Sequence, residues 1–187
     1  LLFDIHEPTY EQKYIQKADV YIYNLIGKGT GIVVDLNATS RLDAPIHKIL
    51  HAFKIDVPIT QTSGKTDANV RLDIKFLPFD INATGKFKLS PSDFTLSGLP
   101  MSTKYGEVRL DNFKIMLDNA NLRYKNLFDI NATGTFDAKK SNYEGKIDIN
   151  SLLLDFSGTK LLKINNLADQ NASFSIENGV TKMALPS

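Results

Sequence analysis

Apolar and polar residues alternate with a period of two along much of the chain. From Phe79 to Leu89 every second position is Phe, Ile, Ala, Gly or Leu, and the positions between them are Asp, Asn, Thr and Lys. The same alternation runs from Phe128 to Phe136. Because successive side chains of a β-strand point to opposite faces, the pattern predicts many half-buried strands with one apolar face each.

One segment departs from this period. After Pro45, the residues Ile46, Ile49, Leu50 and Phe53 recur at the spacing of one helix face. Proline is favourable at the first helical position, so the pattern predicts a short amphipathic helix over 45–54. We expect its apolar stripe to cover the open end of a sheet, where unpaired edges would otherwise meet water.

Four pairs that contain glycine are typical of turns between strands. These pairs are Ser63-Gly64, Tyr105-Gly106, Glu144-Gly145 and Asn178-Gly179.

The chain also repeats itself. The heptapeptide FDINATG occurs at 79–85 and again at 128–134, and weaker copies begin at Asp35 and Asp169. This spacing predicts one β-repeat segment over 1–187, with units near 34–44, 79–89, 128–138 and 168–177. The chain starts at Leu1 and contains no apolar run near ~18 residues, so we expect an excerpt of a longer chain whose membrane anchor lies elsewhere.

Composition narrows the possible functions. The chain has 22 Lys and Arg against 21 Asp and Glu, interspersed along its length, which argues against a nucleic-acid partner. It has no cysteine, which excludes disulfides, thiolate catalysis and thiolate metal sites. With three histidines and no Gly-x-Ser-x-Gly motif, nucleophilic catalysis has no evident starting point. We therefore expect no enzyme, no catalytic residue and no cofactor.

Two local motifs favour ordinary interpretations. The stretch Ser63-Gly64-Lys65-Thr66 resembles part of a phosphate loop, but Ile59 stands where that loop needs its first glycine, which favours a turn. His47 and His51 are four residues apart, with Asp43 four residues earlier. No further ligand accompanies them except His6, so we interpret them as solvated residues and predict no metal site.

Four asparagines, Asn37, Asn82, Asn131 and Asn171, lie in N-x-[ST] sequons, and each has Asp two residues earlier. This arrangement resembles the acidic sequon of bacterial N-glycosylation, which would place the protein in the periplasm. Alternatively, Asp, Asn and Thr are the outward polar positions of one repeated strand. Both interpretations remain open.

A resemblance to a known family rests on three stretches: the strands carrying [FV]-D-[IL]-N-A-T, Pro45–Leu50 followed by Val57–Thr66, and Gly106–Asp111. Over about residues 18–160 the chain resembles the AsmA-like superfamily of Gram-negative envelope proteins, nearest to its YhdP branch and more distantly to TamB. The resemblance implies a long antiparallel sheet curled into a half-open taco. It also implies a periplasmic protein, tethered to the inner membrane, whose apolar groove conducts phospholipid toward the outer membrane.

Strand length supports this expectation. The stretch 79–89 spans about 36 Å at ~3.3 Å per residue. One short helix cannot cover a sheet of such strands, so the apolar face must be buried by a second sheet, by curling or by a ligand. We expect acyl chains and neighbouring segments of the same longer chain as partners. The predicted groove-lining residues are Val34, Leu36, Phe79, Ile81, Phe87, Leu89, Phe128, Ile130 and Phe136.

The main alternative is a closed β-sandwich that serves as a binding or adhesion module of the cell envelope, because two packed sheets produce the same alternation. A transmembrane barrel is less consistent with the sequence, since Tyr and Phe do not cluster at the strand ends.

Overall fold

A computed structural model describes residues 1–6, 9–10, 13–26, 29–52, 59–96, 98–112, 114–137, 140, 142–156, 158–177 and 180–184. Strands dominate it, as the alternation predicted. The strands are β1 (Leu2–His6), β2 (Thr9–Tyr10), β3 (Lys13–Tyr23), β4 (Gly31–Ser40), β5 (Ile59–Gln61), β6 (Thr66–Phe76), β7 (Phe79–Leu89), β8 (Ser92–Leu96), β9 (Leu99–Thr103), β10 (Gly106–Asp111), β11 (Lys114–Tyr124), β12 (Phe128–Asp137), β13 (Asn142–Phe156), β14 (Thr159–Glu177) and β15 (Val180–Ala184). One helix, α1 (Ala44–Ala52), interrupts them.

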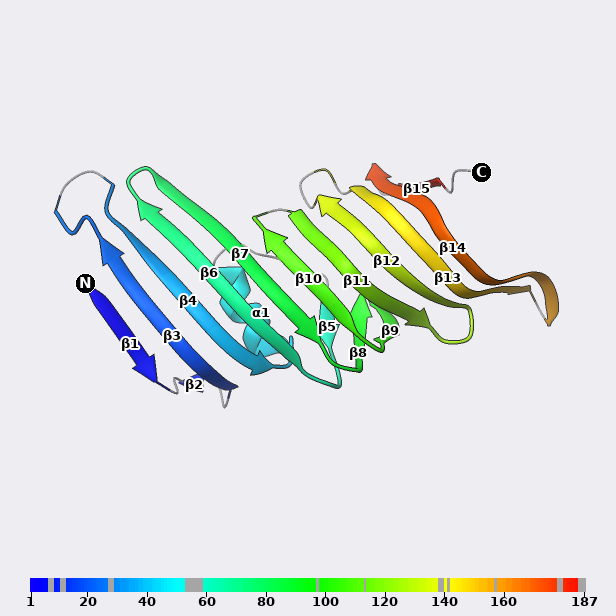
Figure 1. Cartoon of the computed structure of the whole chain (residues 1–187), viewed down its shortest axis with the longest axis horizontal. Helices are drawn as coiled ribbons and strands as arrows, with labels where there is room; N and C mark the ends of the chain where they lie inside the picture. Colours follow the sequence, from blue (N-terminus) through cyan, green and yellow to red (C-terminus); the bar gives the residue numbers. More distant parts are fainter. Residues whose placement is uncertain are drawn as a thin grey trace.

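The strands form one open antiparallel sheet. Its main path follows the order β1-β3-β4-β6-β7-β10-β11-β12-β13-β14-β15. Four short strands lie off this path: β2 pairs with β3, and β5, β8 and β9 form a branch in which β5 pairs with β8, β8 with β9, and β9 with β11. The strands of the main path lie side by side along the long axis, with β1 toward one end of that axis and β14 and β15 toward the other (Figure 1).

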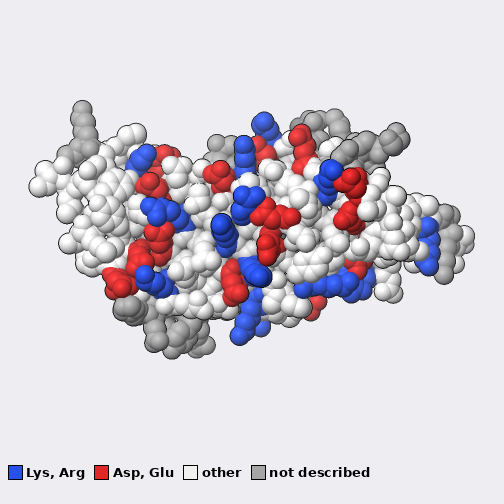
Figure 2. Space-filling view, viewed as in Figure 1, with Lys and Arg blue, Asp and Glu red and all other residues white. Residues whose placement is uncertain are grey.

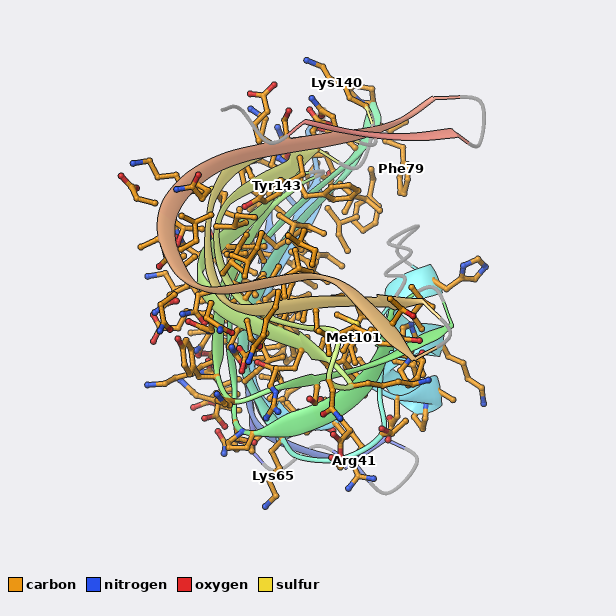
Figure 3. All side chains as sticks on the ribbon, turned by 90° about the vertical axis from the view of Figure 1, so that its right-hand side faces the viewer. Arg41, Lys65, Phe79, Met101, Lys140 and Tyr143 are labelled. Atoms are coloured by element: carbon orange, nitrogen blue, oxygen red, sulfur yellow. The ribbon has the colours of Figure 1, made fainter. Side chains whose placement is uncertain are left out.

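The sheet is curled rather than flat. Viewed along its long axis, the ribbon follows a C, with Phe79, Met101 and Tyr143 inside the curve and Lys65 and Lys140 outside it (Figure 3). The predicted half-open taco is therefore confirmed. The alternative of a closed sandwich is not found in the described part of the chain.

Irregular pairing accompanies the curvature. The register shifts in four neighbouring strand pairs: at Glu107/Val108 between β10 and β11, at Leu117/Ala120 between β11 and β12, at Asp129/Ile130 between β12 and β13, and at Ile147/Ile149 between β13 and β14. A β-bulge bends its strand and increases the local twist. Bulges in a series of neighbouring strand pairs bend the sheet out of plane.

The β8–β9 hairpin and β5 form the lower part of the C. Phe94 of β8 and Met101 of β9 are buried, with 5% and 7% of their surface exposed. The buried amide of Gln61 joins these elements to the sheet. Its Nε2 donates to Ser92 Oγ (2.8 Å), and its Oε1 accepts from Leu42 N (3.0 Å) and Thr66 Oγ1 (2.9 Å). These bonds hold together β5, the segment just before α1, the start of β6 and the start of β8.

Helix α1 begins one residue before its predicted start. The described part does not include residues 53–54 of the predicted helix, and with them the stripe residue Phe53. It also leaves out the side chains of Ile49 and Leu50. Ile46 of the stripe is half-buried. The helix lies on the open side of the C (Figure 3), and His47 Nε2 is 3.4 Å from Thr60 Oγ1 of β5.

The predicted turns have different outcomes. Gly64 has a φ of +77° and Ser63-Gly64 forms a bend, which confirms the turn there. Tyr105 lies between β9 and β10, also as expected. The turn at Glu144-Gly145 is wrong, because both residues lie inside β13. Asn178-Gly179 lies outside the described residues.

Charged residues cover the convex face of the sheet, where Lys and Arg stand beside Asp and Glu (Figure 2). Several ion pairs join neighbouring strands. Arg71 of β6 contacts Asp35 of β4 at 2.9 Å, and Lys146 of β13 contacts Asp169 of β14 at 2.6 Å. Exposed pairs of this kind stabilise a fold by about 0–1 kcal/mol each. Their main effect is to keep the convex face polar and hydrated.

A buried polar cluster forms around Asp129. The Asn121 side chain, in a residue only 1% exposed, donates from Nδ2 to Asp129 Oδ1 (2.8 Å), and Asn150 Nδ2 donates to the same oxygen (2.9 Å). Lys104 Nζ and Arg123 Nε lie 3.2 and 3.4 Å from Asp129 Oδ2. Burial alone would raise the pKa of Asp129. The hydrogen bonds from Asn150, Asn121 and Lys104 together lower it by more than burial raises it, so the pKa lies below its ordinary value of 3.8.

We expect Asp129→Asn to reduce the acid sensitivity of folding. The carboxyl has a lower pKa in the folded state than in the unfolded state, so its contribution is present above pH 3.8 and is lost as pH falls through the folded pKa. Asp129→Asn should cost about 1–3 kcal/mol at neutral pH and flatten the loss of stability as pH falls below 3.8. Urea unfolding at each pH measures both effects.

The control is Asp80→Asn, at the matching position of the first FDINATG copy, where the side chain is exposed. Equal effects of the two substitutions would show that the cluster around Asp129 does not stabilise the fold.

Candidate functional site: the concave apolar face

Apolar residues on the inside of the C are aligned from strand to strand. In an antiparallel sheet, directly opposed residues share a face. One row of opposed residues crosses nine consecutive strands of the main path without a polar member. This first row consists of Ile5, Ala18, Leu36, Val70, Gly85, Leu110, Ile115, Phe136 and Tyr143.

A second apolar row lies two positions along each strand, on the same face. It consists of Ala38, Ala68, Phe87, Val108, Leu117, Gly134 and Gly145. We call the surface made by these rows, and by the apolar residues that continue them toward the strand ends, the concave apolar face. Because the rows run across the strands, the face extends along the long axis of the molecule.

Most of this face is only half-buried. In the first row Leu36, Val70, Leu110, Ile115 and Phe136 are all of intermediate exposure. Residues on the inner face of a closed sandwich would be packed by a second sheet and nearly fully buried. Partial exposure along most of the row is what a single curled sheet produces.

The predicted groove-lining residues come from three strands: β4, β7 and β12. The register aligns Leu36 with Phe136 through the first row and places Phe87 in the second. Strand alternation then places the others on the same concave face. All nine predicted residues therefore share one face, namely Val34, Leu36, Phe79, Ile81, Phe87, Leu89, Phe128, Ile130 and Phe136. Eight of them are half-buried, whereas Phe79, near a strand end, is 61% exposed.

A pair of opposed glycines brings two strands of this face unusually close. A Cβ on Gly145 would lie 2.6 Å from Gly134 Cα and would also meet the Thr133 carbonyl oxygen. The Tyr143 side chain lies over the pair. Its hydroxyl is 2.6 Å from the position that a Cβ on Gly145 would take, and it donates a hydrogen bond to the Thr133 carbonyl oxygen (3.2 Å). Burial raises the pKa of Tyr143. The tyrosine thus fills the space that two missing side chains leave.

Sequence reasoning did not include Tyr143 and Ile149, which are 5% and 4% exposed, among the lining residues. Both lie on β13, which was divided by the expected turn at Glu144-Gly145. A signal was present, because Tyr143, Gly145, Ile147 and Ile149 continue the period-two alternation without interruption.

The four sequon asparagines all lie within strands: Asn37 in β4, Asn82 in β7, Asn131 in β12 and Asn171 in β14. Asn82 is exposed and Asn37 is half-buried. Asn131 Oδ1 accepts hydrogen bonds from Asn121 Nδ2 (3.0 Å) and the Tyr105 hydroxyl (3.1 Å). The Asn171 side chain lies outside the described part. Glycosylation of these residues stays a prediction.

Other candidate chemistry is limited in the described residues. Among them no three His, Asp or Glu side chains gather as metal ligands would, and this includes Asp43, His47 and His51. No helix within the described ranges has the length and hydropathy needed to cross a bilayer.

The fold and this face define a class of protein: an open, curled β array that is polar outside and apolar inside. The family model described as YhdP protein matches residues 1–187, so the chain belongs to the YhdP family, an AsmA-like family of cell-envelope proteins. No curated protein and no solved structure matches the chain significantly.

Proposed function

We propose that this chain is a non-enzymatic segment of a periplasm-spanning lipid conduit, which shields phospholipid acyl chains in an apolar groove between the inner and outer membranes. The longer protein would be tethered to the inner membrane by a segment outside this chain. The observation that carries the proposal is the first row, which is apolar on nine consecutive strands and half-buried along most of them.

The energetics of lipid transfer favour such a surface. Exposing an acyl chain to water costs about 0.8 kcal/mol per CH₂, or on the order of 10 kcal/mol for a sixteen-carbon chain. A carrier must therefore offer apolar contact without a polar gap. Nine strands at ~4.8 Å spacing extend the first row over about 38 Å.

The two open edges of the sheet fit a segment of a longer array. Among the described strands, β1 pairs with β3 alone, and residues Leu2, Phe3 and Ile5 are 67%, 46% and 42% exposed. An exposed apolar edge of this kind is a site for strand addition. A neighbouring segment of the same longer chain that paired there would continue the first row.

We expect the purified chain to carry phospholipid. Native mass spectrometry with organic extraction should detect it, and ANS should fluoresce strongly with the folded protein and be displaced by added phospholipid. The physical reason is the uncovered apolar face. Cooperatively folded protein that bound neither ANS nor phospholipid would contradict the proposal.

A further inference from the structure

Two adjacent turns at one edge of the sheet expose large apolar side chains. Leu25 and Ile26, between β3 and β4, are 60% and 97% exposed. Phe76, Leu77 and Phe79, around the β6–β7 turn, are 42%, 71% and 61% exposed. The turns are neighbours, because Phe76 N donates to the Thr30 carbonyl oxygen (3.0 Å) and β4 pairs with β6. We call these five residues the apolar rim.

The apolar rim is unusual for turns, which normally carry Gly, Asn, Asp or Ser. The next two turns along the same edge (Figure 1) carry polar residues in their described parts, including Asp111, Asn112 and Lys140. The five side chains of the rim expose on the order of 600 Å² together, as much as the largest apolar patch on a typical monomer, which is often functional.

The apolar rim is continuous with the concave apolar face. Phe76 and Phe79 are directly opposed, and the pairs Ile74–Ile81 and Leu72–Ala83 follow on the same face. Exposure falls along this line, from 61% at Phe79 to 4% at Leu72 and at Ala83. Figure 3 shows Phe79 at one tip of the C, directed toward its open side.

No charge interrupts this line on the inner face. The nearest described ionisable side chains along these strands, Lys75 and Asp80, oppose each other one position from Phe76 and Phe79, and therefore point to the convex face. A surface whose described residues include no cation suits a hydrocarbon tail rather than a phosphate head group.

We propose that the apolar rim is a docking surface for one acyl chain of a phospholipid, which it receives and passes onto the concave apolar face. This inference rests on the proposed function. A chain that crossed from a membrane to the face through water would expose its methylene groups, and the rim covers part of that surface during the crossing.

The proposal predicts an effect on rates and not on affinity. A surface that only stabilises the crossing accelerates loading and release equally, so its removal leaves the equilibrium constant unchanged. A surface that holds the bound lipid would instead change affinity through faster release. The two roles are distinguished by measuring both rates.

The test uses Ile26→Ser/Leu77→Ser, which removes the two most exposed rim side chains. The matched control is Leu99→Ser/Leu127→Ser, because these leucines are 55% and 36% exposed away from the rim. Vesicles of phosphatidylethanolamine and phosphatidylglycerol carry a pyrene-labelled phospholipid, and stopped-flow fluorescence follows its transfer to and from the protein. We expect the rim variant to load and release about fivefold more slowly with affinity within about twofold, and the control to match the unmodified protein.

Three results would overturn the inference. A rim variant that loads as fast as the control shows that the rim is not used. A wild-type dimer in sedimentation that only the rim variant abolishes shows that a second copy occupies the rim. If the unmodified protein takes up no lipid, both the proposed function and the inference fail. If the unmodified protein and the rim variant take up lipid at the same rate, only the inference fails.

Discussion

Ile81→Asp is expected to reduce acyl-chain binding at least thirtyfold. Ile81 ends a row of four opposed isoleucines, with Ile22, Ile32 and Ile74, on the concave apolar face. A carboxylate there keeps its charge only if it stays hydrated, and an acyl chain lying on the face would remove that water, at a cost of about 2 kcal/mol or more. Titration of the protein with a fluorescent fatty acid measures the loss.

The matched control is Asn82→Asp, on the same strand. Asn82 is the next residue, is exposed and faces the convex side. It receives the same charge at nearly the same place without touching the concave face. Because Ile81 is only half-buried, both variants should fold, which circular dichroism checks. Equal binding by the two variants would show that acyl chains do not use the concave face.

Gly145→Ala should be among the most destabilising substitutions in the chain. The new Cβ would lie 2.6 Å from Gly134 Cα and against the Thr133 carbonyl oxygen and the Tyr143 hydroxyl, so strands β12 and β13 would have to separate. Overpacking of this kind costs about 3 kcal/mol or more when backbone has to move. Chemical denaturation should show the shift directly.

Gly106→Ala is its control. Gly106 is likewise a strand residue on the concave side. It is buried, but the nearest atom to its Cβ would be Leu89 Cδ1 at 3.5 Å, an ordinary contact. We expect a cost below about 1 kcal/mol. If Gly145→Ala is equally mild, the opposed glycines are not held at their close spacing by the fold.

The strands and the helix could be predicted because their signals are local. Strand β7 spans Phe79–Leu89, as the alternation predicted. Its side chains point alternately to the concave and the convex face, so the period of two is enough to identify it. The start of α1 agreed within one residue because Pro45 marks a first turn. The shared face of the nine lining residues follows from the same alternation.

The remaining features depend on residues far apart in the sequence. Gly145 suggested a turn, but the structure uses it to bring β13 close to Gly134 and Tyr143. Val33 is only 7% exposed although it lies on the convex face, opposite Tyr21, whose ring stacks with that of Tyr23 at 6.3 Å. The branch formed by β5, β8 and β9 depends on the buried Gln61, and no period in the sequence reports such a contact.

The two copies of FDINATG run in opposite directions. They lie in β7 and β12, three steps apart on an antiparallel path through β10 and β11 (Figure 1). The same heptapeptide therefore presents Phe, Ile, Ala and Gly to the concave face whether its strand points one way or the other. Tandem copying of a two-strand hairpin would have kept the copies in the same direction. At these two strands the face is chemically alike from either end. Under the proposed function, the heptapeptides would therefore give lipid no preferred direction, and net movement past them would follow a difference in lipid supply between the ends of the face.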